Sequence, residues 1–317
     1  MHGGAGSASP PEETAASEAE VRAALAGALA SGHGVLAAGG SAVDAVVAAV
    51  RVLEDCEWLN AGRGSVLDAT GRVEMDAAVM EGASRRAGAV AGLRGVVNPV
   101  LAARAVMERS PHVLLAGDGA ERFARDQGLP MAAPEFFVTE LRRRQLARWR
   151  ERSAAGWSLP GVSNPSEASN PGGARNAGGG TVGAVARDAR GHLAVATSTG
   201  GLTGKLPGRV SDSALIGAGS FADDATCAVS ATGTGDAFIR AGFAHAVDAL
   251  VRHAGMDLEE ACQRALADVR ALGGSGGCIA LDAAGRAALP FDTEWMARGL
   301  IGPDGRPRVA LEPGEPL

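Results

Sequence analysis

The sequence has no tyrosine and few aromatic residues of any kind. Aromatic residues make up 3% of the 317 positions, so a hydrophobic core must be built from alanine, valine and leucine. Lysine is nearly absent as well: Lys205 is the single one, and arginine supplies the other strongly basic side chains. No apolar run reaches the roughly 20 residues that cross a membrane, and the glycine-rich, then acidic start does not resemble a secretory signal. We therefore expect a cytoplasmic protein without a membrane partner.

Cysteines are few and widely separated. None forms a Cys-x-x-Cys pair, so the sequence indicates neither a zinc site nor a disulfide framework. We interpret the four as reduced, mostly buried thiols: Cys56, Cys227, Cys262 and Cys278.

Positive charge is not gathered as nucleic-acid binding requires. The formal net charge is -6 and both signs are spread along the chain, whereas phosphate binding needs a basic face. The arginine-rich stretch 138–152 has no interleaved aromatic residues, so we interpret it as a helix with a solvated face. Both observations argue against nucleic acid as the natural partner.

Hydrophobic patterning divides the chain into a mostly helical first part and a second part that begins with paired strands. Between them, 153–180 is rich in Ser, Asn, Pro and Gly, which is typical of a flexible linker. This order of elements predicts two packed sheets covered by helices, an αββα sandwich, in one catalytic domain 1–317. The expected helices cover 14–31, 41–55, 99–108, 112–126, 138–152, 234–254 and 257–271; the expected strands cover 64–68, 73–80, 181–187, 192–198, 214–218, 226–231, 277–282 and 286–290.

The linker ends in three glycines, Gly178-Gly179-Gly180, and Thr181 then opens an apolar, strand-like run. Glycine lets another group approach the backbone closely. A threonine hydroxyl is a weak nucleophile, and a free N-terminal amine on the same residue is one known activator. Cleavage of the Gly180–Thr181 bond would give Thr181 that amine. We therefore predict a self-cleaving hydrolase that splits into 1–180 and 181–317, with Thr181 as nucleophile.

Further motifs follow one another along the chain at 2–6, 53–62, 75–77, 178–201, 205–213, 216–219 and 230–236. In content and order they resemble the isoaspartyl peptidase/L-asparaginase family, the plant-type asparaginases among the N-terminal nucleophile hydrolases. The resemblance covers nearly all of the chain except 153–177. It implies an αββα fold of that type and hydrolysis of β-aspartyl dipeptides and of L-asparagine to L-aspartate.

The resemblance also implies how the reaction runs. The Thr181 hydroxyl first attacks the Gly180 carbonyl, giving an ester that water resolves, and later attacks the side-chain amide carbonyl of the substrate. The freed amine, with an unperturbed pKa of about 8, takes the hydroxyl proton near neutral pH. Thr199 orients the nucleophile, and the Thr232 hydroxyl and the Gly233 N–H form the oxyanion hole.

Substrate recognition is assigned by the same resemblance. Arg209 meets the free α-carboxylate of the substrate and Asp212 its α-amino group, which suits the two-point geometry of a guanidinium and the charge of a carboxylate. The implied substrate-binding residues are completed by Asn60, Thr232, Gly233, Thr234 and Gly235.

The resemblance implies no required cofactor and one structural sodium ion, held by backbone carbonyls. Oxygen ligands suit such a hard cation. The carbonyls that match the family's sodium site are those of Leu53, Glu54, Cys56, Leu59, Ala61 and Arg63. The resemblance also implies that the cleaved units pair as a homodimer.

The chain departs from the family pattern at three places. Family members place a short apolar strand before the His-Gly-Gly-Ala-Gly motif, whereas this sequence starts at Met1, so we expect an open edge on a neighbouring strand. Ser211 stands where glycine is usual, and Gly204 where asparagine is commoner.

Three other functions remain open from the sequence. An aspartylglucosaminidase-type enzyme shares the fold and chemistry but hydrolyses a glycosylated asparagine. An uncleaved, non-catalytic relative would serve as a binding or structural protein. A nucleotide-binding protein is least favoured, because the glycines near Thr232 form neither Gly-x-Gly-x-x-Gly nor a Walker A motif.

Overall fold

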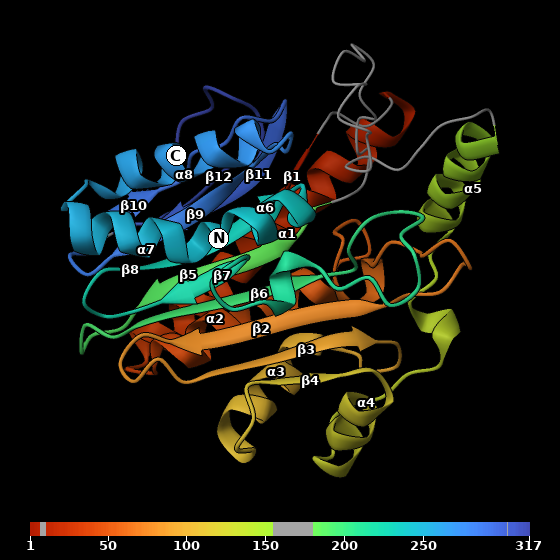
Figure 1. Cartoon of the computed structure of the whole chain (residues 1–317), viewed down its shortest axis with the longest axis horizontal. Coiled ribbons are helices and arrows are strands. Elements are labelled where there is room, and N and C mark those ends of the chain that lie inside the picture. Colours follow the sequence, from red (N-terminus) through yellow and green to blue (C-terminus); the bar gives the residue numbers. More distant parts are fainter. Residues whose placement is uncertain (7–10, 155–179, 303) are drawn as a thin grey trace.

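The computed structural model describes residues 1–6, 11–154, 180–302 and 304–317, which form four stacked layers (Figure 1). Two β-sheets pack on each other and helices cover their outer faces, which confirms the αββα sandwich. The larger sheet is covered by α1 (Pro11–Ala37), α2 (Ala42–Asp55) and α3 (Pro99–Arg109), and the smaller one by α7 (Phe243–Ala254) and α8 (Leu258–Ala271). No helix in these ranges is long and apolar enough to cross a membrane.

Both sheets are antiparallel except where β3 meets β4. The larger sheet has the order β12 (Pro307–Ala310), β11 (Trp295–Ile301), β1 (His2–Gly6), β5 (Val182–Arg187), β6 (Leu193–Thr199), β2 (Met75–Glu81), β3 (Ala87–Leu93) and β4 (Leu114–Ala116). The smaller has β10 (Ala287–Ala288), β9 (Gly276–Asp282), β8 (Cys227–Gly233) and β7 (Ser220–Ala222). Shorter or peripheral helices are α4 (Gly117–Asp126), α5 (Glu140–Ala154), α6 (Gly235–Ala241) and the 3-10 turns η1 (Gly62–Gly64), η2 (Pro134–Phe136) and η3 (Asp212–Ala214).

Local sequence signals explain the elements that were predicted correctly. The Ser41 hydroxyl accepts the Asp44 N–H at 3.1 Å and caps α2, whose apolar face is buried against β5 and β6. β5 and β6 form the expected hairpin, with the pairing running from Val182–Ser198 to Arg187–Leu193. The core is aliphatic, as the lack of aromatic residues required.

Four predicted elements differ from the structure. In the predicted helix 112–126, Leu114–Ala116 form strand β4 and only Gly117–Asp126 are helical. Residues 64–68 form no strand: Leu67 accepts only the Gly204 N–H and is buried beneath a loop, so its apolar character reflects burial rather than sheet pairing. In the larger sheet β2 lies between β6 and β3, and the sequence did not indicate β3. Residues 214–218 are not a strand; η3 and a turn precede β7. The single helix 234–254 is two helices, because Gly242 has a left-handed backbone with φ 57°.

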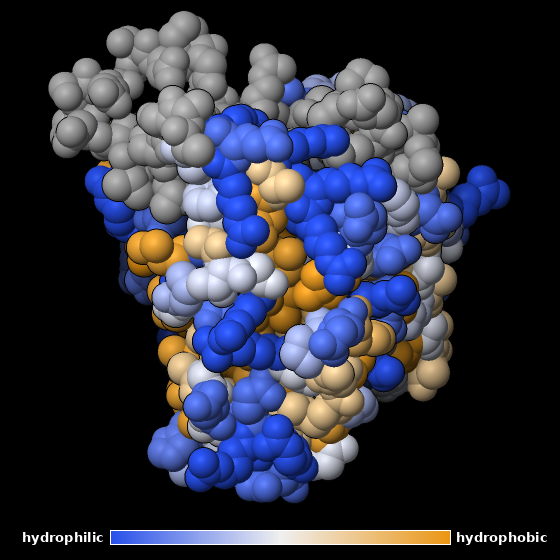
Figure 2. Space-filling view, turned by 90° about the vertical axis from the view of Figure 1, so that its right-hand side faces the viewer, coloured by the Kyte–Doolittle hydropathy of each residue, from blue (hydrophilic) through white to orange (hydrophobic). Residues whose placement is uncertain are grey.

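The structure tests the prediction of the arginine-rich helix but not most of the prediction of the linker. Helix α5 exists, and on its side of the molecule hydrophilic residues prevail (Figure 2). However, Arg142 is buried and donates to the Gly64 carbonyl at 2.5 Å, so this arginine joins α5 to the protein instead of facing solvent. The predicted linker falls mainly on 155–179, which lie outside the described residues; 153–154 still belong to α5.

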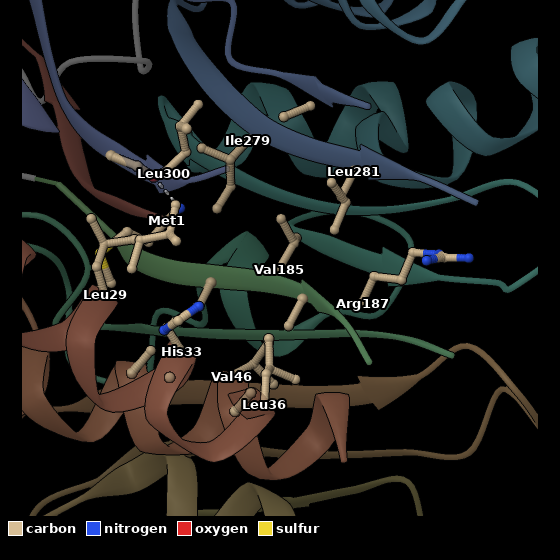
Figure 3. A pocket seen from close by; sticks show the side chains of 18 of the residues that line it. Met1, Leu29, His33, Leu36, Val46, Val185, Arg187, Ile279, Leu281 and Leu300 are labelled. Atoms are coloured by element: carbon tan, nitrogen blue, oxygen red, sulfur yellow. Dashed lines mark hydrogen bonds between the residues drawn. The ribbon is translucent and has the colours of Figure 1, made fainter. Parts of the chain in front are cut away.

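The larger sheet is incompletely paired at its centre. β1 pairs with β11 along its length but with β5 only at His2–Gly183. Beyond that pair, β5 and β11 face each other across a groove of about 350 Å³ lined by apolar residues such as Val185, Ile279 and Leu300 (Figure 3). The Met1 amino group lies in it and donates to the Gly299 carbonyl at 2.8 Å. Strand edges next to β1 are thus open, as the sequence led us to expect.

Candidate active site

Thr181 lies directly before β5, at the wall of a small pocket formed by segments that are far apart in the sequence. Its side chain is buried, with 6% of the residue exposed. The pocket is lined by Gly180, Thr181, Thr199, Gly201, Leu202, Arg209, Ser211, Asp212, Gly233 and Gly235. The fold therefore gathers most of the residues singled out from the sequence around the Gly180–Thr181 bond.

Two hydroxyl groups lie next to Thr181. Its N–H donates to Thr232 Oγ1 at 3.1 Å, and its own Oγ1 is 3.5 Å from Ser213 Oγ. Sequence reasoning did not select Ser213, although it directly follows Asp212 at the end of the 205–213 motif.

Thr232 and Gly233 end β8 beside this bond. Thr232 Oγ1 also accepts the Ala5 N–H at 3.1 Å, so two donors occupy its lone pairs and its proton is left to donate elsewhere. Gly233 has φ 145°, and a Cβ there would lie 2.2 Å from the Ser275 carbonyl oxygen, so only glycine fits.

Thr199 is brought to the same pocket by the β5–β6 pairing. Val182 pairs with Ser198, which places Thr199 level with Thr181 at the end of the hairpin. Its hydroxyl accepts the Gly201 N–H at 3.0 Å, and this bond shapes the turn that follows β6.

Arg209 and Asp212 form the charged side of the pocket. Arg209 donates to Asp236 at 2.8 Å, and Asp212 is buried in η3. Gly235 allows this arrangement, because a Cβ there would lie 2.4 Å from Asp212 Oδ1 and 3.0 Å from Arg209 Nη2. Burial raises the pKa of Asp212 to about 7, although Arg209 acts in the opposite direction.

Two buried polar atoms of this pair have no hydrogen-bond partner in the described part of the chain: Arg209 Nε and Asp212 Oδ2. Since buried polar groups are normally hydrogen-bonded, unsatisfied ones beside a pocket point to a ligand that completes them.

Like Thr232, which contacts the Thr181 N–H, Asn60 and Thr234 are not among the residues that line the pocket. The Asn60 amide donates to the Gly201 carbonyl at 2.8 Å and accepts the Val66 N–H at 2.9 Å, so it supports the turn after β6. Thr234 exchanges bonds with Ser275, its N–H donating at 2.9 Å and its hydroxyl accepting at 3.2 Å. Both residues therefore support the pocket from behind.

His2 and the four cysteines are not among the residues that line the pocket. His2 Nε2 is 2.8 Å from Ser230 Oγ, and burial lowers the pKa of His2 to about 3, so the ring stays neutral at ordinary pH. All four cysteines are free thiols.

The loop predicted to bind sodium follows α2. Its carbonyls are partly engaged: Leu53 O accepts the Cys56 N–H and Cys56 O accepts the Leu59 N–H. Carbonyl oxygens of Cys56 and Leu59 converge on Gly64, where a Cβ would lie 2.8 and 2.0 Å from them. Each carbonyl has a second lone pair, so oxygen donors remain there. In the part of the chain that the structure describes, no group of three or more His, Cys, Asp or Glu side chains could hold a metal.

The departure at Gly204 has a structural counterpart. Gly204 has φ 74°, and a Cβ there would lie 2.2 Å from the Trp149 ring on α5. We expect Gly204→Asn to destabilise the protein by about 2 kcal/mol through overpacking. The loss should shrink markedly in a Trp149→Ala background, measured as a double-mutant cycle of unfolding midpoints. An equal loss in both backgrounds would contradict this contact.

The fold is an αββα sandwich in which a Gly–Thr bond directly precedes a central strand. Beside this bond lies a pocket with a guanidinium and a buried carboxylate. Together these features define a hydrolase of the N-terminal nucleophile class. A family model described as asparaginase matches residues 1–311. The chain is 48% identical to the Escherichia coli isoaspartyl peptidase over 299 residues, covering 94% of this chain and 90% of that protein. The mouse isoaspartyl peptidase/L-asparaginase is 43% identical, with 88% and 78% covered. A probable isoaspartyl peptidase/L-asparaginase 2 of Arabidopsis thaliana is 38% identical, with 98% and 97% covered. The chain belongs to this asparaginase family.

Proposed function

We propose that this enzyme cleaves its own Gly180–Thr181 bond and then hydrolyses the β-amide of L-asparagine and of β-aspartyl dipeptides, releasing L-aspartate. One observation carries the proposal: the pocket holds Thr181 at its wall together with Arg209 and Asp212, whose unsatisfied polar atoms suit an α-carboxylate and an α-ammonium. The names of the relatives support the same two substrates.

The contacts of the pocket support a mechanism in which each group has one task. Thr181 Oγ1 attacks the Gly180 carbonyl carbon, the amide bond breaks, and water hydrolyses the resulting ester, leaving a free Thr181 amine. That amine then takes the hydroxyl proton as Thr181 attacks the substrate amide, and ammonia or an amino acid leaves before water releases aspartate. The free proton of Thr232 and the Gly233 N–H stabilise the oxyanion in both reactions.

The positions of the remaining residues support auxiliary roles. Thr199 shapes the edge of the pocket next to the nucleophile, Asn60 supports the turn at Gly201, and Thr234 and Gly235 form the wall behind Arg209 and Asp212. We infer that the products 1–180 and 181–317 stay together, because β1 and β5 are neighbours in one sheet.

The substrate range is tested by aspartate release from L-asparagine, β-aspartyl-leucine and N-acetylglucosaminyl-asparagine. We expect turnover of the first two and none of the third, with Thr181→Ala as the inactive control. Preferred turnover of the glycosylated substrate would favour the aspartylglucosaminidase alternative instead. An intact chain with no hydrolysis from about pH 6 to 9, the range in which the amine titrates, would contradict the proposal as a whole.

We further propose a sodium ion at the carbonyls of the 53–63 loop, a dimer of cleaved units and a cytoplasmic location. The convergent carbonyls and the four free thiols support the first and the last of these. If the sodium site exists, the unfolding midpoint will be higher in NaCl than in tetramethylammonium chloride of equal ionic strength. Light scattering measures whether the cleaved units form a dimer.

A further inference from the structure

Two buried carboxylates beside β2 face the segment that carries Arg209 and Asp212. Glu74 immediately precedes β2 and Asp76 is its second residue; 2% and 0% of these residues are exposed. Neither takes part in the chemical steps proposed above. Because burying a charge is costly unless it is paired and hydrogen-bonded, their partners show what they do.

Each carboxylate holds one backbone amide of the recognition segment, which we define as residues 208–212. Glu74 Oε2 accepts the Gly208 N–H at 2.6 Å, and Asp76 Oδ2 accepts the Ser211 N–H at 2.7 Å. The two amides lie on either side of Arg209, and the second belongs to the residue before Asp212. The recognition segment is thus tied down at both ends by charge-assisted hydrogen bonds.

The second oxygen of each carboxylate is anchored elsewhere. Asp76 Oδ1 accepts the Gly92 N–H at 2.9 Å, and Glu74 Oε1 accepts from Arg94 at 2.5 Å. Both carboxylates therefore use their two oxygens to join the recognition segment to the region of β3. An amide side chain, with one accepting oxygen, cannot satisfy both of these donors in the same way.

The single lysine of the chain balances this negative charge. Lys205 is buried, and its ammonium donates to the Glu74 carbonyl at 2.6 Å. Burial lowers the pKa of Lys205, and Arg209 acts in the same direction, whereas the charges of Asp76 and Glu74 favour the ammonium. Two carboxylates, Arg94 and Lys205 thus form a charge-balanced support under the recognition segment.

We propose that Glu74 and Asp76 are positioning residues that set the substrate affinity by holding Arg209 and Asp212 toward the pocket. This inference rests on the proposed function. Both residues precede the Gly180–Thr181 bond and the recognition segment follows it, so after cleavage one chain positions the substrate-binding residues of the other. Neither carboxylate contacts Thr181, Thr232 or the Gly180 carbonyl, so self-cleavage does not depend on them.

The test compares Asp76→Asn and Glu74→Gln with Glu81→Gln, which changes a carboxylate at the far end of β2 that binds Arg86 and Ser84. We expect each of the first two variants to cleave itself normally and to raise KM for L-asparagine about tenfold, with kcat changed by less than about twofold. Hydrogen exchange of the peptide covering 206–212 should accelerate in both, and stay as in the wild type in Glu81→Gln.

A fall in kcat as large as the rise in KM, or unchanged hydrogen exchange at 206–212, would overturn the positioning role. If Asp76→Asn fails to fold, Glu74→Gln decides by the same two measurements. If the wild type hydrolyses none of the tested substrates, the proposed function fails by itself. Exchange at 206–212 and calorimetric binding of L-aspartate, which carries the same α-carboxylate and α-ammonium, then decide the positioning role separately: faster exchange and weaker binding support it, and no change overturns it.

Discussion

Thr181→Ala protein will remain one chain and will have no measurable hydrolysis, a loss of about 10⁴-fold or more. The substitution removes the hydroxyl that attacks Gly180, so the activating amine is never released. The fold should persist, because the backbone N–H that binds Thr232 is retained. Intact-mass spectrometry on fresh and incubated protein measures cleavage, and aspartate release measures turnover.

Two variants sharpen this experiment. Thr181→Ser keeps a hydroxyl and should still split into two fragments, the second beginning at residue 181. Thr70→Ala changes a turn threonine that binds Asp68 and does not line the pocket, so this variant should behave as the wild type. Cleavage of Thr181→Ala at the same bond would show that another group attacks Gly180.

Asp212→Asn will lower kcat/KM by about 10²-fold, because the substrate ammonium then loses its only carboxylate in the lining of the pocket. The wild type has a linked dependence on pH. Since the pKa of Asp212 is raised to about 7, the carboxylate becomes protonated as pH falls below 7, and kcat/KM falls with it. The Thr181 amine also titrates, so the slope of log kcat/KM against pH should approach two at low pH in the wild type and one in Asp212→Asn.

Stability gives an independent check with the opposite sign. A carboxyl group whose pKa is higher in the folded than in the unfolded state lowers the free energy of unfolding when it ionises. For Asp212 this loss of stability develops as the pH rises from the ordinary pKa of an aspartate toward 7. Asp212→Asn should therefore unfold at a higher temperature than the wild type at pH 8, and the two should converge near pH 4. A wild type with pH-independent kcat/KM between 5 and 8 would contradict this role of Asp212.

Sequence reasoning succeeded where neighbours along the chain decide the structure. The helix cap at Ser41 and the β5–β6 hairpin depend on side chains and turns within a few residues. It failed at β3, Ala87–Leu93, whose alanines and glycines have low strand propensity. That strand exists because α3 packs closely on it: a Cβ at Gly88 would lie 2.2 Å from the Ala103 carbonyl oxygen.

The amino-acid sequence by itself determined the fold class, the family and the short list of candidate residues, because the Gly–Thr step and the 205–213 and 230–236 motifs are contiguous. Only the tertiary structure decided which groups meet. It placed the Ala5 N–H on Thr232, left Asn60 and Thr234 behind the pocket, raised the pKa of Asp212 by burial, and set Glu74 and Asp76 against the recognition segment. The bonds from Ala5 to Thr232, from Gly208 to Glu74 and from Ser211 to Asp76 each join residues more than a hundred positions apart. They arise from sheet pairing that no local pattern encodes.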